Sequence, residues 1–188
     1  MFPNSHGEGE GISMEINSRT LESFSIPRKF DINSKCYFGE GFYSYVFFDG
    51  LVATKIFRID KGVSEEHVRE AFHDEVKAYT LAQSSVDVIA ITPRFFGPVK
   101  FKEIINNPLP YEQSLAPRAE ILLWDCAYQI EYVSECFKKL SEASYYEDVK
   151  QKFYKVGINY IQDSSIAITN EDPLKIYVID FGIEASNL

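Results

Sequence analysis

The sequence has few cysteines and histidines, and none of them forms a spaced set of metal ligands. Its three cysteines (Cys36, Cys126 and Cys136) lie far apart, and no CxxC pair is present. An odd number of widely separated thiols is typical of a reducing compartment, and this spacing excludes the usual zinc sites. The three histidines are equally scattered. We therefore expect no metal site built from cysteine or histidine.

The chain also lacks a long apolar run and an excess of basic residues. No stretch approaches the ~18 apolar residues that span a bilayer, and the N-terminus has no signal-peptide pattern. There are 19 basic and 28 acidic residues, for a net charge of −9. Because nucleic acids and anionic membranes are bound by clustered Lys and Arg, this balance argues against both partners. We expect a cytoplasmic protein; export without a classical signal would leave no trace in this sequence.

The 188 residues, 45% of them apolar, are enough to build a core without disulfides. The pattern predicts strands at 35–39, 42–48 and 51–59, a helix at 64–83, strands at 98–101 and 119–123, helical structure over 128–156 with a break at 141–144, and strands at 166–169 and 175–179. This order of elements predicts the α+β class.

The turn between the first two predicted strands contains two glycines, in Gly39-Glu40-Gly41-Phe42-Tyr43-Ser44-Tyr45-Val46. Glycines let a backbone approach a ligand closely and direct its N–H groups at phosphates, although many hairpins have two glycines and no ligand. The third predicted strand contains Lys55, which shares a face with Ala53 and Phe57. Taken alone, Lys55 is better explained as an exposed strand residue, because a lysine flanked by apolar residues in a strand is usually exposed.

An acidic residue lies in the apolar face of the predicted helix. At 100° per residue, Glu75 projects into the middle of that face. The apolar residues around it are Val68, Ala71, Phe72, Tyr79 and Ala82. A carboxylate directed at the interior is costly unless it meets a cation. We therefore predict an ion pair between Glu75 and Lys55.

A second acid, Asp180, follows the apolar strand Ile176-Tyr177-Val178-Ile179 and precedes Phe181-Gly182. An acid at the carboxyl end of a strand, with a glycine behind it that permits a sharp turn, suits a Mg²⁺ ligand.

In this order and spacing, the motifs resemble the protein kinase superfamily, including its atypical and very small members. The resemblance covers about residues 36–182 and includes Ile91-Thr92-Pro93-Arg94-Phe95-Phe96-Gly97 and Glu120-Ile121-Leu122-Leu123-Trp124. It implies a two-lobed fold. Residues 1–35 would be a flexible leader, 36–123 a β-rich N-lobe with one helix, and 124–188 a hinge and a truncated, mostly helical C-lobe.

The resemblance further implies that ATP and Mg²⁺ bind between the lobes. Lys55 would pair with the α and β phosphates and with Glu75, Asp180 would hold Mg²⁺, and Trp124 to Cys126 would line the adenine edge. Ser44 replaces the third glycine of the family. The residues expected to contact the nucleotide are Gly39, Gly41, Ser44, Val46, Ala53, Lys55, Glu75, Trp124 and Cys126.

The expected catalytic loop departs from the family pattern. His-Arg-Asp, with Asn five residues after the Asp, is absent from residues 157–167. Asp163 lies 17 residues before Asp180, near the spacing of the catalytic base, but Ile168 is the residue five positions later. Counting back from the strand at 166 places Tyr160 or Ile161 there instead. Asp163 is therefore either the base or a turn residue. Ser164 or Ser165 would be weak substitutes for the second metal ligand.

The resemblance favours a minimal protein kinase that transfers the γ-phosphoryl group of ATP to a protein hydroxyl. The sequence ends six residues after Gly182, without the family's activation segment and substrate-binding helices. A catalytically impaired pseudokinase, acting as an interaction or inhibitory module, is thus the alternative, and a cut fragment is another. Phosphorylation of a small molecule is a third hypothesis, against which the absence of a His-Gly-Asp loop counts.

Overall fold

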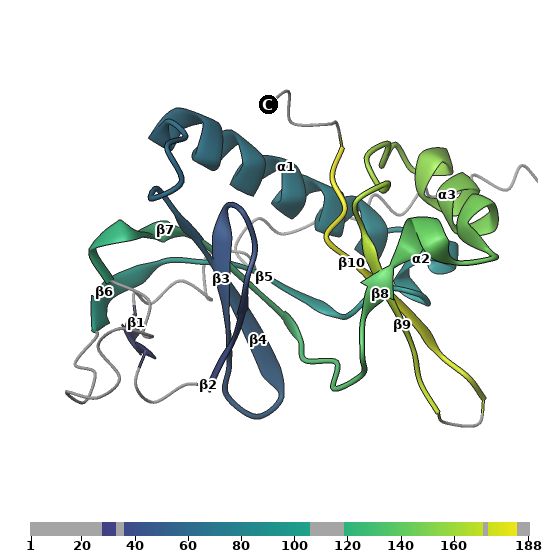
Figure 1. The fold of residues 1–188 in the computed structure, drawn as a ribbon, viewed down its shortest axis with the longest axis horizontal. Coiled ribbons are helices and arrows are strands. Elements are labelled where there is room, and N and C mark those ends of the chain that lie inside the picture. Colours follow the sequence, from purple (N-terminus) through teal and green to yellow (C-terminus); the bar gives the residue numbers. More distant parts are fainter. Residues whose placement is uncertain (1–27, 33–35, 106–118, 171–172, 184–188) are drawn as a thin grey trace, which may run out of the picture.

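The computed structural model describes residues 28–32, 36–105, 119–170 and 173–183 (Figure 1). They form a mixed α+β structure, which confirms the predicted class. The strands are β1 (Arg28–Asp31), β2 (Cys36–Glu40), β3 (Ser44–Phe48), β4 (Val52–Arg58), β5 (Phe95–Val99), β6 (Phe101–Ile105), β7 (Leu122–Glu131), β8 (Lys138–Lys139), β9 (Ser165–Ile168) and β10 (Ile176–Ile179). The helices are α1 (Glu65–Gln83), α2 (Val86–Ile89) and α3 (Tyr146–Lys155), with short 3₁₀ helices η4 (Ala119–Ile121) and η5 (Leu140–Glu142).

The larger sheet has five antiparallel strands in the order β2-β3-β4-β7-β5. The hairpin predicted at Asp49-Gly50 joins β3 to β4. Gly50 has a φ of 104°, a conformation that other residues rarely adopt. In β4, Lys55 is paired with Val46 of β3 on one side and with Tyr128 of β7 on the other. This register places Lys55 in the interior of the sheet and away from its edges.

Helix α1 confirms the prediction for residues 64–83. Ser64 is its N-cap, and the Ser64 hydroxyl accepts a hydrogen bond of 3.2 Å from the His67 N–H. Two glutamates in the first turn complement the positive end of the helix dipole. All five apolar residues predicted around Glu75 are buried. This face packs against the sheet, where Phe57 and Phe72 meet edge to face at 5.5 Å.

The second sheet has the order β10-β9-β8 and lies with α2 and α3 on the other side of the molecule in Figure 1. The predicted C-terminal hairpin is present as antiparallel β9 and β10. The main hydrophobic core extends from α1 into this region through Phe181. The Phe181 ring lies 4.5 Å from that of Tyr79 in α1 and 4.9 Å from that of Phe153 in α3.

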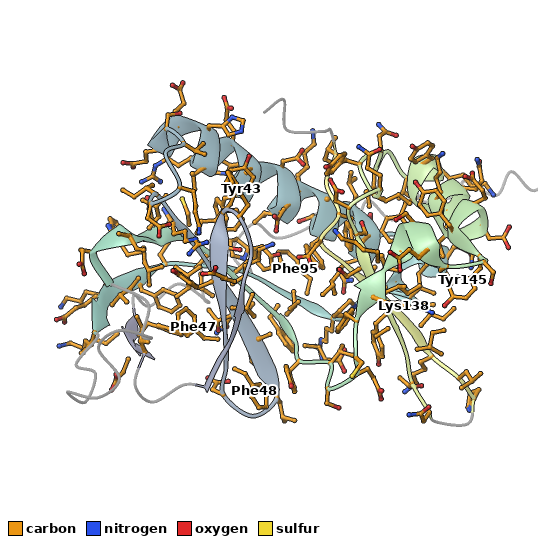
Figure 2. The ribbon with its side chains drawn as sticks, viewed as in Figure 1. Tyr43, Phe47, Phe48, Phe95, Lys138 and Tyr145 are labelled. Carbon is orange, nitrogen blue, oxygen red and sulfur yellow. The ribbon has the colours of Figure 1, made fainter. Side chains whose placement is uncertain are left out.

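A smaller core covers the opposite face of the five-stranded sheet. There, β1 and β6 form a parallel pair, and the Phe30 ring lies 5.3 Å from that of Phe47 and 4.7 Å from that of Phe101. Phe47 is labelled in Figure 2. Part of the predicted leader, residues 28–32, is thus ordered here. The rest of that leader lies outside the described residues.

The prediction for residues 119–156 was wrong in two respects. The strand begins at Leu122 and continues to Glu131, because β7 pairs with β4 on one side and β5 on the other. The expected boundary between 123 and 124 therefore falls within a strand. Of the predicted helical stretch only α3 is an α-helix, and the region after β7 combines it with β8, β9 and β10. That region is therefore mixed and not mostly helical. Among the described residues no helix is long and apolar enough to cross a membrane.

Candidate functional site

A cavity of about 1080 Å³ lies between the β2–β3 turn, the inner strands of the large sheet, one side of α1 and the end of β10. Its volume is slightly above the usual range for small-molecule sites, roughly 300–1,000 Å³. The predicted site residues that line it are Gly39, Gly41, Ser44, Val46, Ala53, Lys55, Glu75, Asp163 and Asp180. Residues from five separate parts of the sequence thus meet at one cavity.

Lys55 links two acids that are 105 residues apart in the sequence. Its Nζ donates to Glu75 Oε1 at 3.0 Å and Oε2 at 2.8 Å, and to Asp180 Oδ1 at 3.2 Å. The predicted Lys55–Glu75 ion pair is therefore present. The side chains of Lys55 and Glu75 are only 13% and 18% exposed, whereas that of Asp180 is 49% exposed. Glu75 is thus held in the interior, while Asp180 remains accessible from the cavity.

The hydroxyl of Tyr128 completes this arrangement by donating to Glu75 Oε2 at 2.7 Å. Burial alone would lower the pKa of Lys55, but the charges of Glu75 and Asp180 outweigh burial and raise it above its ordinary value. Burial, followed by the charge of Glu75, raises the pKa of Tyr128 well above its usual range. Lys55 therefore stays charged and Tyr128 stays protonated at neutral pH.

Asp180 has an unusual backbone conformation. Its φ of 59° makes it the one non-glycine residue with positive φ among the described residues. The left-handed conformation costs about 1–2 kcal/mol for a residue with a side chain. Lys55 holds the Asp180 carboxylate, and the buried Ser164 hydroxyl donates to the Asp180 carbonyl at 3.0 Å. A strained residue held at a cavity by its neighbours is typical of functional sites.

The glycines of the β2–β3 turn leave space above the cavity. Neither Gly39 nor Gly41 has a positive φ, so the backbone conformation does not require glycine there. A Cβ at Gly39 would meet nothing within 4 Å, and one at Gly41 would only touch Ser44 at 3.4 Å. Their lack of side chains instead keeps this edge of the cavity open to a close approach of a ligand.

Acidic side chains outnumber lysines around the cavity. The acids are Glu40, Glu70, Asp74, Glu75, Glu131, Asp163 and Asp180, and the lysines are Lys55, Lys77 and Lys139. In the described part of the chain no three His, Cys, Asp or Glu side chains form a group that could by itself hold a metal ion. A polyanionic ligand would therefore need a cation that it shares with an acid such as Asp180.

The chain matches no protein-family model and no curated protein sequence. Its function is therefore inferred from the residues that meet at the cavity.

Two predicted contacts with the nucleotide need correction. Trp124 and Cys126 do not line the cavity, because they occupy the far end of β7. Trp124 is exposed, and Cys126 lies beside Arg69 of α1, whose Nη1 is 3.1 Å from its sulfur. In this segment Tyr128 and residues 130–133 do line the cavity.

Asp163 lines the cavity from the segment between α3 and β9. Its carboxylate accepts a hydrogen bond from the Tyr160 hydroxyl, and its carbonyl accepts one of 3.2 Å from Lys139 Nζ. Tyr160 and Lys139 also line the cavity, whereas Ser164 and Ser165 do not. The two serines are thus not placed as ligands for a metal ion in the cavity.

Sequence reasoning missed Tyr128, Lys139 and the edge formed by residues 130–133. Tyr128 pairs with Lys55, and Ile130 lies two residues further along β7, so a strand assignment would have placed both on the face of Lys55. Lys139 had no such signal, because its approach to Asp163 depends on the pairing of β8 with β9.

Proposed function

We propose that this chain binds ATP with Mg²⁺ in the cavity and transfers the γ-phosphoryl group to a hydroxyl of a protein substrate, in a two-lobed fold similar to that of protein kinases. The observation that carries the proposal is the bridge from Lys55 to Glu75 and Asp180 beside an open glycine turn. A buried carboxylate holds the lysine in place, and an accessible one is left at the cavity, which is the arrangement needed to bind a metal–phosphate group.

The phosphates would lie between the glycine turn and Lys55. In this position Lys55 would donate to the phosphate oxygens, while Glu75 and Tyr128 keep its side chain extended toward the cavity. Asp180 would hold Mg²⁺, which on binding would neutralise part of the charge on the phosphates. The excess of acids around the cavity makes this ion necessary, because ATP alone would be repelled.

The base of the nucleotide would lie on the apolar side of the cavity. Val46 and Ala53 line it from neighbouring strands. Ile130 lines it from the last part of β7, and Val133 lines it from two residues beyond that strand. Apolar walls with a few polar groups are typical of sites that bind planar organic ligands. This edge would take the role that the family resemblance assigned to Trp124 to Cys126.

A catalytically impaired pseudokinase that acts as an interaction module is the alternative, and a specific contact favours it. A general base must be able to accept the proton of the acceptor hydroxyl. One carboxylate oxygen of Asp163 already accepts a hydrogen bond from Tyr160. Ser164 and Ser165 do not line the cavity, so neither is placed as a second metal ligand. Among the described residues, the cavity thus has groups suited to bind Mg·ATP but lacks one that phosphoryl transfer would use.

Nucleotide binding can be tested by thermal unfolding with and without ligand. At 100 times its dissociation constant, Mg·ATP should raise the melting temperature by about 5–10 °C, whereas ATP with a chelator should raise it far less. Lys55→Met and Asp180→Asn should remove most of the shift. Lys100→Met, at an exposed lysine outside the cavity, should retain it. An unchanged melting temperature at millimolar Mg·ATP would refute both the enzyme and the binding module.

Catalysis is tested separately with a cell lysate, labelled ATP and mass spectrometry of the labelled proteins. If Asp163 is the base, Asp163→Asn should leave the affinity for Mg·ATP nearly unchanged and reduce phosphorylation by roughly 10²–10⁴. Equal labelling by wild type and variant would make Asp163 a turn residue. Nucleotide binding without any labelling would favour the pseudokinase.

A further inference from the structure

The most deeply buried charge of the large sheet is an arginine that the proposed chemistry does not use. Arg58 is the last residue of β4, and its side chain is only 1% exposed. It comes three residues after Lys55 but does not line the cavity. Because a buried guanidinium is costly unless its donors are bonded, the groups around Arg58 indicate what it holds in place.

Two of the three guanidinium nitrogens bind the glycine turn directly. Nη1 donates to Glu40 Oε2 at 3.1 Å, and Nη2 donates to the Gly41 carbonyl at 2.9 Å. The backbone N–H of Arg58 also donates to the carbonyl of Tyr43 at 2.8 Å. Residues 40, 41 and 43 of the turn are thus all bonded to this single residue of β4.

The remaining contacts fix the guanidinium itself. Its Nε lies 3.3 Å from Asp60 Oδ1, in an ion pair without hydrogen-bond geometry, and its plane lies over the Tyr45 ring at 4.1 Å. On the other side of the turn, the Tyr43 hydroxyl is 3.2 Å from His67 Nε2 of α1, and Tyr43 is labelled there in Figure 2. The turn is therefore held from β4 and in contact with α1.

We propose that Arg58 is a positioning residue for the nucleotide: it holds the glycine turn in its open conformation over the cavity and keeps the Glu40 carboxylate paired. This inference rests on the proposed function. Glu40 is half exposed and lines the cavity beside the expected phosphates. If it were unpaired, its charge would repel them. Arg58 thus acts through the turn and has no contact with the ligand.

The geometry requires an arginine at this position. One planar guanidinium reaches a carboxylate and a carbonyl with separate, fixed donors, whereas a lysine ammonium has no such fork. Arg58→Lys keeps the positive charge in the core and loses the simultaneous bonds to Glu40 and Gly41. It is therefore the variant that removes the two side-chain bonds between β4 and the turn with the least disturbance of the fold.

Hydrogen exchange and nucleotide affinity together test the proposal. The variants are Arg58→Lys, Glu40→Gln, the double variant, and Arg69→Lys as a matched control. Arg69 also forms two ion pairs, with Glu65 and Asp125, but does not contact the turn. In ligand-free Arg58→Lys, amides of residues 41–45 should exchange about tenfold faster than in wild type, the ratio expected for the loss of one hydrogen bond to a charged group. Those of β7 should be unchanged.

Affinity for Mg·ATP should fall by about tenfold in Arg58→Lys by the same reasoning. In the double variant, part of the affinity should return although exchange in the turn stays fast, because the unpaired carboxylate is gone. A protein whose stability alone was lowered would not regain affinity in this way. Arg69→Lys should change neither the exchange of the turn nor the affinity.

Two results would overturn the proposal: unchanged exchange of residues 41–45 in Arg58→Lys, or faster exchange with unchanged affinity. If the wild type binds no nucleotide, the proposed function fails. Exchange would then still report whether Arg58 orders the turn, so the two failures are distinguishable. Should Arg58→Lys not fold, Glu40→Ala provides the same exchange measurement, because it removes the Nη1 partner from a half-exposed position.

Discussion

The ion pair of Lys55 predicts an asymmetry between two substitutions that a simple pair would not have. Removal of one partner from a fully buried pair costs about 3–5 kcal/mol of the free energy of unfolding. Lys55→Met leaves Glu75 and Asp180 at the same point without their shared cation. Glu75→Gln leaves Lys55 with a second acid, Asp180, at 3.2 Å. The lysine substitution should therefore cost more.

The side chains of Lys55 and Glu75 are more than four-fifths buried, so the lysine substitution should approach the lower end of that range. We expect a loss of about 3 kcal/mol for Lys55→Met, where the Tyr128 hydrogen bond still supports Glu75. For Glu75→Gln we expect about 1.5–2 kcal/mol, the lower part of the range for a hydrogen bond to a charged group, because Lys55 keeps Asp180 as a partner. The double substitution should cost less than the sum by about 1–3 kcal/mol, because residues in contact are coupled.

The assay is urea unfolding at pH 7 with a chelator present, so that no metal ion replaces the lysine. Midpoints and slopes should be measured for wild type, both single variants and the double variant. Lys77→Met, at an exposed lysine of α1, is the control and should change the free energy of unfolding by less than about 0.5 kcal/mol. Additive effects, or a larger loss for Glu75→Gln than for Lys55→Met, would refute the assignment of Lys55 as the shared partner of two acids.

Three further predictions concern neighbouring groups. Tyr128→Phe should lower the free energy of unfolding by about 1.5–3 kcal/mol in the same urea assay, because it removes a hydrogen bond to the buried Glu75 carboxylate. Partial burial raises the pKa of Asp125, but the hydrogen bond and charge of Arg69 outweigh it and leave that pKa lowered. Wild type should therefore be more stable than Asp125→Asn at pH 7, and this difference should shrink as pH falls from about 5 to 2 in acid unfolding curves. Burial and the nearby Asp125 raise the pKa of Cys126 to about 11, so iodoacetamide at pH 8 should alkylate the exposed Cys136 well before Cys126, as followed by mass spectrometry. Equal loss of stability at acid and neutral pH, equal alkylation of the two thiols, or an unchanged stability of Tyr128→Phe would contradict the respective contact.

Local periodicity determined the parts of the fold that need no distant partner. The Asp49-Gly50 turn, the Ser64 cap and the C-terminal hairpin all depend on residues close in sequence. The same periodicity placed Glu75 among apolar residues of α1. Because an unpaired carboxylate is too costly in such a place, the sequence also implied its partner Lys55.

Only the tertiary structure decided where β7 lies. Its ten residues pair with β4, about seventy positions earlier, and with β5, so its hydrogen bonds are all non-local. The local pattern of residues 122–131 contains alanine, glutamine and glutamate as well as apolar residues, and it suits a helix as well as a strand. The expected edge of the cavity was therefore Trp124 to Cys126, whereas the residues that line the cavity are 130–133.

The role proposed for Arg58 also comes from tertiary structure alone. In the sequence Arg58 is one charged residue at the end of a strand, which is ordinarily exposed. The hairpin of β2 and β3 brings Glu40 and Gly41 to one side of it, and β7 and the Tyr45 ring cover the others. Burial of a charge depends on which segments pack around it, and that information is not local. The sequence thus determined which residues could carry charge into the interior, while the fold decided which of them are held there and by what.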